Sequence, residues 1–309
     1  YQRRVRVTYN ISLQLLQEAI LKQIMKNSCL TQQEVDNVTE GQEGKVKNGC
    51  LFLTKQQYEV RAFRERKDFK FVIAKNLKSV SSKLFSKSSL QFGFMPNVEN
   101  IASSAFYSCP LLTAICFLKV KTVEEWAFYG CSQLSQVFIP ICEELGEHCF
   151  DLCKNIKILD LPLVKKVGLH QFQHCISLTD LIIPLTEEMG ENCFWNCGAL
   201  ESIDSQLDAN LLKNEFRCTD MCRKNKNCVI CKGQLQECLK KGNDPENRQR
   251  VQKKLEDQTL ILLQEAGLEQ QYQIEVLTNK MKQKDKQIDQ LFEQNKELRE
   301  EVEKLKKAK

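Results

Sequence analysis

The sequence predicts a solenoid of short repeats followed by a long helix. Phenylalanine recurs every 22 residues from Phe106 to Phe216, without one slip. A cysteine follows three residues after each of the first five, and apolar residues follow at further steps of three. After Pro245 the composition changes to Gln, Glu, Lys and Leu, with no further proline. The first two observations predict the solenoid, and the third predicts the helix.

The columns of the repeat indicate how its coils stack. A period of 20 to 29 residues with closely spaced Leu and Ile is typical of leucine-rich repeat solenoids, in which neighbouring coils bury each other's apolar side. The stretch L-x-x-I-x-I has apolar residues at alternate positions, as a short strand does. Gly146, Gly168 and Gly190 share one column, where we expect a turn with positive φ.

The best copies are LGEHCFDLCKNIKILDLP (145–162) and MGENCFWNCGALESID (189–204). They resemble the BspA-like (Treponema pallidum-type) leucine-rich repeats. The resemblance covers about residues 71–217, and residues 76–95 look like a worn first copy without the cysteine. Gln171 replaces the small residue that precedes Phe in the other copies, so we expect a locally looser coil.

Twelve of the 16 cysteines fall into two groups, seven within the repeats and five beyond them. Those within the repeats form periodic columns, which we interpret as buried, reduced thiols in preference to metal ligands, and which favour a reducing compartment. Beyond the repeats, zinc is a weak alternative to a reduced cap and linker over residues 218–245, and disulfides are another. The zinc candidates are Cys218, Cys222, Cys228 and Cys231, which match no standard finger spacing.

Residues 246–309 fit a heptad pattern. In the last three heptads Ile, Asn and Val occupy a positions and Leu occupies d positions, which favours a parallel two-stranded coiled coil. The dimerisation residues predicted there are Ile288, Leu291, Asn295, Leu298, Val302 and Leu305. One helix from Glu246 to Lys307 would be roughly 90 Å long. A solitary helix or a disordered tail is the alternative.

The N-terminal residues 1–70 predict a partly helical cap for the first coil. Residues 11–24 have helical spacing, Thr31 and Glu34 form a capping box, and residues 50–71 suggest strands. The tripeptides that begin at Asn10 and Asn37 are glycosylation sequons, which matter only in a secreted chain.

Charge and composition exclude several classes of function. The repeats at 98–217 carry 16 acidic and 8 basic residues, whereas the whole chain has a net charge of +5. The basic stretch 220–254 contains Gly242 and Pro245, so we interpret it as a solvated linker and expect no nucleic-acid partner. No apolar run is long enough to cross a membrane. No nucleophile is paired with a base, and His148, His170 and His174 are expected to be solvated. We therefore predict neither an enzyme nor a cofactor.

The sequence instead favours a protein-interaction scaffold, with recognition on the concave strand face and self-association as a parallel homodimer. Side chains that alternate with the core column point outward, and six of them form an apolar patch with acidic edges suited to a basic partner. They are Phe138, Ile158, Asp160, Asp180, Ile182 and Asp204. The alternative is that a lateral neighbour or a terminal segment, such as the basic N-terminal region, covers them. We expect a cytoplasmic location. The resemblance implies a secreted or surface adhesin instead if a signal peptide precedes Tyr1.

Overall fold

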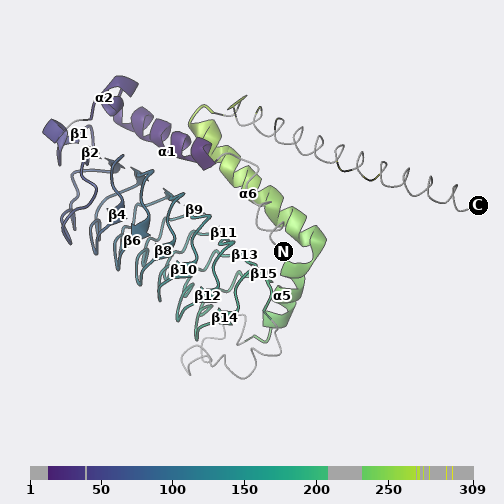
Figure 1. Ribbon diagram of the computed structural model, residues 1–309. Helices are drawn as coiled ribbons and strands as arrows, with labels where there is room; N and C mark the ends of the chain where they lie inside the picture. Colours follow the sequence, from purple (N-terminus) through teal and green to yellow (C-terminus); the bar gives the residue numbers. More distant parts are fainter. Residues whose placement is uncertain are drawn as a thin grey trace, which may run out of the picture.

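The computed structural model describes residues 13–38, 40–207 and 232–268, with a few isolated positions beyond them. The chain forms a solenoid of short parallel strands with helices along one face and across one end (Figure 1). The predicted fold class is confirmed.

Six coils contribute a longer strand and a two-residue strand on another side, and the first and last described coils contribute a longer strand alone. The longer strands are β2 (Cys50–Phe52), β3 (Phe71–Ile73), β5 (Phe92–Phe94), β7 (Ala114–Cys116), β9 (Gln136–Phe138), β11 (Ile158–Asp160), β13 (Asp180–Ile183) and β15 (Ser202–Ser205). The two-residue strands are β4 (Ser79–Val80), β6 (Asn100–Ile101), β8 (Thr122–Val123), β10 (Glu144–Leu145), β12 (Lys166–Val167) and β14 (Glu188–Met189), which form one six-stranded sheet. Only β1 (Val46–Lys47) pairs antiparallel among the described strands, with β2.

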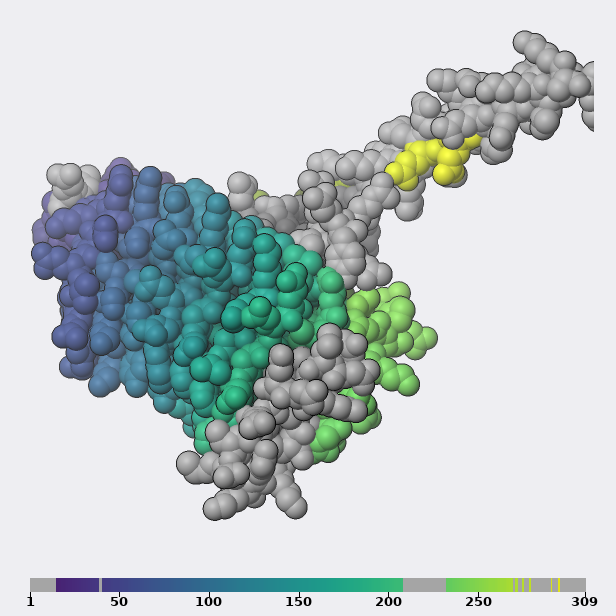
Figure 2. Space-filling model, turned by 60° about the horizontal axis from the view of Figure 1, so that its bottom comes forward, coloured from purple at the N-terminus to yellow at the C-terminus, as the bar shows by residue number. Residues whose placement is uncertain are grey.

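The 22-residue register places equivalent residues directly on one another, and the coils follow one another in chain order along the solenoid (Figure 2). Ile158 pairs with Asp180, and Asp180 pairs with Ser202. The Phe rings stack inside the solenoid, with centroids 5.6 Å apart between Phe128 and Phe150 and 6.4 Å apart between Phe150 and Phe172. The wider step lies at the coil that contains the buried Gln171, as expected for a larger side chain in that column.

The solenoid begins earlier than residue 71. The strand β2 pairs in parallel with β3, at an offset of 21 residues instead of the 22 of the later coils. Phe63 stacks on Phe85 at 5.8 Å, so it is a further member of the Phe ladder. Residues 50–70 therefore form a coil of the solenoid, and its divergent sequence hid this from the periodicity.

The repeat cysteines are buried thiols, as predicted. Among the described residues no cysteine forms a disulfide, and all except Cys29 are buried. Each thiol of the column three residues after Phe lies against the Phe carbonyl of the preceding coil, as with Cys131 and Phe106 (3.2 Å) or Cys153 and Phe128 (3.2 Å). The column thus adds a weak hydrogen bond between coils as well as filling the core.

The glycine prediction was wrong. Gly146, Gly168 and Gly190 do not have positive φ, whereas Trp126, His148 and other residues of the next turn do. A Cβ at Gly146 would lie 2.2 Å from the Glu125 backbone nitrogen. Glycine is required there because the coils approach each other closely.

The helices complete the solenoid. Two short N-terminal elements, α2 (Gln32–Asp36) and a 3-10 turn (Glu40–Gln42), precede the first coil, and the capping box at Thr31 and Glu34 is confirmed. Helix α1 (Leu13–Ser28) lies along the longer strands rather than over the end of the solenoid (Figure 1). Helix α5 (Leu235–Asn243) packs on β15, so closely that a Cβ at Gly242 would lie 2.1 Å from the Ile203 carbonyl carbon.

The predicted helix from 246 to 307 is not continuous. Helix α6 (Pro245–Glu265) begins at the Asp244 cap and ends before Gly267. Gly267 has a positive φ of 71°, as the turn glycines Gly130 (71°) and Gly233 (69°) do. It runs along the longer strands and contacts α1 (Figure 1). No helix in the described part of the chain is long and apolar enough to cross a membrane.

Candidate partner-binding face

The outward side chains of the longer strands form a surface that we call the strand face. Alternation along each strand places them opposite the core, as predicted. Ile115 and Val137 belong to the solenoid core, whereas their neighbours Cys116 and Phe138 belong to a second cluster shared with the helices. The strand face changes from apolar at its N-terminal end, with Phe52, Phe71 and Ile73, to acidic at its C-terminal end.

Helix α1 covers the apolar end. Its residues Leu16, Ile20 and Ile24 are buried in the second cluster, together with Phe71 and Phe138. Leu262 and Leu263 from the last turn of α6 enter the same cluster. These contacts remove a large apolar area from water, which is the main source of stability for such packing.

Helix α6 covers the acidic end with basic side chains. Arg248 donates to both carboxylate oxygens of Asp204, at 2.8 and 2.7 Å. Asp180 accepts from Arg250 (3.1 Å) and from Lys254 (2.9 Å). The basic stretch that we interpreted as a solvated linker therefore forms, over residues 244–254, a helix bound to the acidic columns.

The environment of Asp180 keeps it charged. Burial raises the pKa of this carboxyl, but hydrogen bonds from Ser202, Lys254 and Thr179 outweigh burial, so that its pKa lies below the usual value. The side chain is fully buried while its two cationic partners remain about 40% and 39% exposed. A buried carboxylate requires such partners, because an unpaired charge there would be costly.

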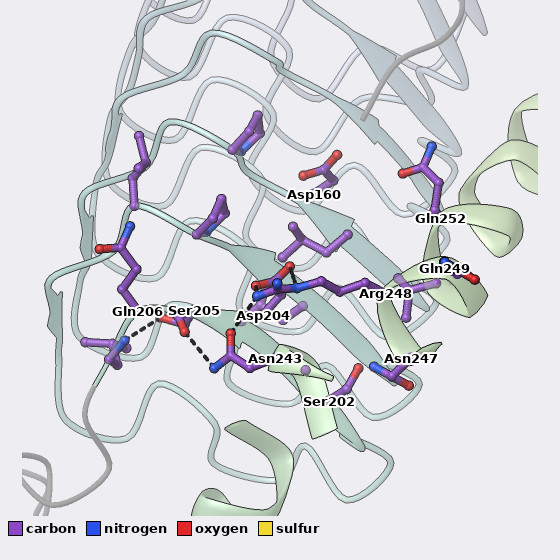
Figure 3. Close-up of a pocket in the computed structure, with 18 of the residues that line it drawn as sticks. Asp160, Ser202, Asp204, Ser205, Gln206, Asn243, Asn247, Arg248, Gln249 and Gln252 are labelled. Atoms are coloured by element: carbon purple, nitrogen blue, oxygen red, sulfur yellow. Dashed lines mark hydrogen bonds and ion pairs between the residues drawn. The ribbon is translucent and has the colours of Figure 1, made fainter. Parts of the chain in front are cut away.

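A groove remains beside α6. It has a volume of about 1070 Å³ and lies between the last coils and the helices α5 and α6 (Figure 3). Pro162, Ile182 and Pro184 supply apolar lining from the solenoid. Polar groups come from both sides, and Asn243 links the two because its amide donates to the Ser205 carbonyl at 2.9 Å.

The structure corrects the predicted exposed patch. Phe138 and Ile158 are each 5% exposed, and Asp180 is buried under α6. The alternative, in which a terminal segment covers the patch, is the one observed. Helix α1 covers the apolar part of the strand face, as the alternative of an N-terminal cover predicts, and helix α6 covers the acidic part. Asp160, Ile182 and Asp204 line the groove. Asp160 is only 2% exposed, so Ile182 and Asp204 are the predicted residues that stay accessible at the groove.

Other predicted residues lie outside the described part of the chain. These are the zinc candidates Cys218, Cys222, Cys228 and Cys231, and the dimerisation residues Ile288, Leu291, Asn295, Leu298, Val302 and Leu305. Within the described ranges, no group of three or more metal-ligating side chains could hold a metal ion.

The histidines are not simply solvated. His148 and His174 each place Nδ1 near a different oxygen of the buried Asp151, at 3.1 and 3.3 Å. His148 and His170 are one 22-residue repeat apart, so their coils are adjacent. His174 lies in the same coil as His170 and therefore reaches Asp151 in the coil of His148. Sequence reasoning considered their spacing along the chain and missed this neighbourhood across coils.

Three solved structures that are similar to this chain show leucine-rich repeats. They are the leucine-rich repeat protein TpLRR of T. pallidum (21% identity, 50% of this chain, 64% of that one, TM-score 0.35), a leucine-rich repeat protein of Bacteroides ovatus (22%, 48%, 52%, 0.36) and a leucine-rich cell surface protein of Faecalibacterium prausnitzii (20%, 51%, 43%, 0.32). This chain thus spans less than two thirds of each. No curated protein matches it.

The family model described as the BspA type leucine-rich repeat region matches six copies, over residues 57–179 and 143–237. That match begins near the early coil at Phe63 that the stacking geometry identifies. The chain therefore belongs to the family of BspA-type leucine-rich repeat proteins.

Proposed function

We propose that this chain is a non-enzymatic protein-interaction protein that recognises its partner in the groove beside α6. Membership of the BspA-type family supports a protein-interaction or adhesin-like role. Because a fold by itself does not define a function, the proposal is argued from the groove and its lining.

The observation that carries the proposal is the composition of the groove. Its volume of about 1070 Å³ is at the upper end of what small-ligand pockets occupy, which leaves room for a peptide segment. Leu185 and Leu207 add to the apolar lining, while Gln249 and Gln252 present amides along the helix side. Apolar lining with polar groups at the edge is typical of protein contact surfaces.

The acidic groups in the groove determine which charge the partner segment should carry. Asp160, Ile182 and Asp204 follow one another in one outward column, so that Ile182 separates the two carboxylates. Arg248 already neutralises Asp204 and Asp160 is buried, so Glu256 supplies the accessible negative charge that a partner would meet. An extended segment with apolar side chains and a basic residue fits this arrangement.

A site-specific photo-crosslinker tests the proposal. Placed at Gln249, which is exposed and lines the groove, it should capture a partner protein in the source cells. The matched position is Ile176, which is 46% exposed and does not line the groove. The same captured proteins at both positions, or none at Gln249, would contradict recognition in the groove.

A blocking variant makes the result specific. Replacing Ile182 with Trp fills the groove without adding charge, so capture at Gln249 should fall while the circular dichroism spectrum stays unchanged. Undiminished capture in a folded I182W protein would mean that the contact lies on α6 outside the groove.

Self-association through residues 288–305 and a cytoplasmic location belong to the same proposal. The heptad pattern supports the first. The second is supported by the thiols, because the buried column cysteines are present as free thiols. Reducing compartments are where such thiols persist.

A further inference from the structure

Another surface is formed by the turns that follow the two-residue strands. In five successive coils these turns occupy residues 102–109, 124–131, 146–153, 168–175 and 190–197. We call this surface the aromatic turn face. Its rings are half-buried, and they come from Tyr107, Trp126, Tyr129, His148, His170, His174 and Trp195. None of these residues belongs to the strand face or lines the groove.

The rings stack from coil to coil. The Trp126 and His148 rings lie 4.0 Å apart at 14°, and the His148 and His170 rings lie 4.5 Å apart at 8°. Beside them Tyr107 stacks on Tyr129 at 4.9 Å. Since Ser104 occupies the Trp126 position in the preceding coil, the stack ends there with a small side chain.

The backbone holds this stack in place. Trp126, His148 and His170 all have positive φ, at 60°, 54° and 53°. Each also donates its backbone N–H to the next coil, as Trp126 does to the Glu147 carbonyl at 2.9 Å. Residues fixed in this way lose little conformational freedom on binding, so that the surface is organised before a ligand arrives.

Charge separates this surface from the start of the solenoid. The five turns contain no Lys or Arg, and their acidic residues are Glu124, Glu125, Glu147, Asp151 and Glu191. The two preceding coils instead carry Arg61 and Lys83 at the position of Trp126, each with positive φ. A cationic ligand would therefore be attracted to the later coils and repelled from the first two.

We propose that the aromatic turn face binds an Arg- or Lys-rich segment of a protein partner. Within the stack the rings cover one another's faces, but among the described residues no ring of the stack covers the Trp126 face that turns away from His148. A Trp face attracts cations more strongly than other aromatic faces, and the Arg guanidinium also stacks on aromatic rings. Exposed Glu125 and Glu147 flank the stack and supply ion pairs at its edge. The ligand differs from that of the groove, so either site can be tested without the other.

The experiment uses the full chain and a peptide of alternating Arg and Gly, nine residues long. Trp126 and Trp195 are the only tryptophans of the chain, and both lie on this surface. Binding should therefore change the intrinsic fluorescence in a saturable way, and added salt should weaken it. A peptide with Glu in place of Arg should leave the fluorescence unchanged.

The affinities of the variants are compared by the fluorescence anisotropy of a labelled peptide, because this signal does not depend on the tryptophans of the protein. Glu125→Gln/Glu147→Gln should weaken binding roughly tenfold. Trp126→Asn should weaken it similarly, and it should fold because Asn192 has the same place and a positive φ in a later coil. The control Glu246→Gln/Asp257→Asn removes the same charge from exposed positions of α6 and should bind like wild type.

Three results would overturn the proposal. The first is equal weakening by the α6 control, which would mean non-specific attraction. The second is unchanged binding in folded W126N. The third is a fluorescence response to neutral oligosaccharides with none to the Arg peptide, which would assign the rings to sugar binding.

Discussion

Arg248 and Asp204 form two parallel hydrogen bonds, of 2.8 and 2.7 Å, between the first turn of α6 and the last strand of the solenoid. The guanidinium also donates to the Asn243 side chain at 2.7 Å. Bidentate pairs fix orientation as well as distance. This pair therefore sets the direction in which α6 leaves the end of the solenoid and runs back along the strand face.

Reversing two charges on α6 should release its N-terminal half. In Arg250→Glu/Lys254→Glu, two carboxylates would face the buried Asp180, so the helix loses its ion pairs and gains repulsion. Hydrogen exchange over residues 245–258 should become faster, with the repeats unchanged. The control Lys240→Glu/Lys253→Glu makes the same change at exposed positions and should exchange like wild type. Equal protection in both variants would contradict the role assigned to these pairs.

Acid should have the same effect in a defined range. The pKa of Asp180 is lowered in the folded chain, so its ion pairs stabilise α6 fully above the unfolded value and are lost as pH falls through the folded value, below about 4. Protection factors of α6, corrected for intrinsic exchange, should stay level from pH 7 to 5 and fall towards pH 3. Asp180→Asn should already be less protected at pH 7 and should lose less on acidification.

Two glycines of one column should respond differently to the same substitution. Gly146→Ala places a Cβ 2.2 Å from a backbone nitrogen, whereas at Gly168 the nearest atom is a Gln171 side-chain oxygen at 3.4 Å. Overpacking against a backbone should cost G146A about 2 kcal/mol or more. G168A should change the free energy of unfolding by less than about 1 kcal/mol. Urea unfolding of both variants measures this, and equal midpoints would show that the coils can separate there.

The heptads beyond the described helices should make the protein a parallel dimer. Truncation after Leu268 keeps α6 on the strand face and should give a monomer, while the full chain sediments as a dimer. Asn295→Val should strengthen assembly and relax its choice of oligomeric state, because a buried Asn at an a position fixes register. A full-length monomer at micromolar concentration in sedimentation equilibrium would remove the dimer from the proposed function.

Periodicity predicted the repeat because every coil faces the same packing problem. Phe150 and Cys153 could be placed in the core from sequence, and so could the outward direction of Asp180 and Ile182. The first coil was missed because Phe63 lacks the cysteine and glycine that mark later copies.

The repeat pattern could not predict that helices cover the strand face. Asp180 and its partner Lys254 are 74 residues apart, and no local rule joins them. A signal was nevertheless present, since the acidic outward column and the basic residues of 244–254 carry opposite charges. The break at Gly267 was also visible at a heptad a position, but the heptad pattern was extended through it.

The column of thiols has a practical consequence. Burial raises the pKa of Cys109 to about 11, and it raises those of Cys131 and Cys153 well above the ordinary value. Because the thiolate is the reactive form, these side chains are shielded from alkylating reagents while their coils are closed. In each coil from Cys109 to Cys197, alkylation of the column cysteine would therefore report the local unfolding of that coil. Mass spectrometry of alkylated peptides would then show where along its length the protein first comes apart.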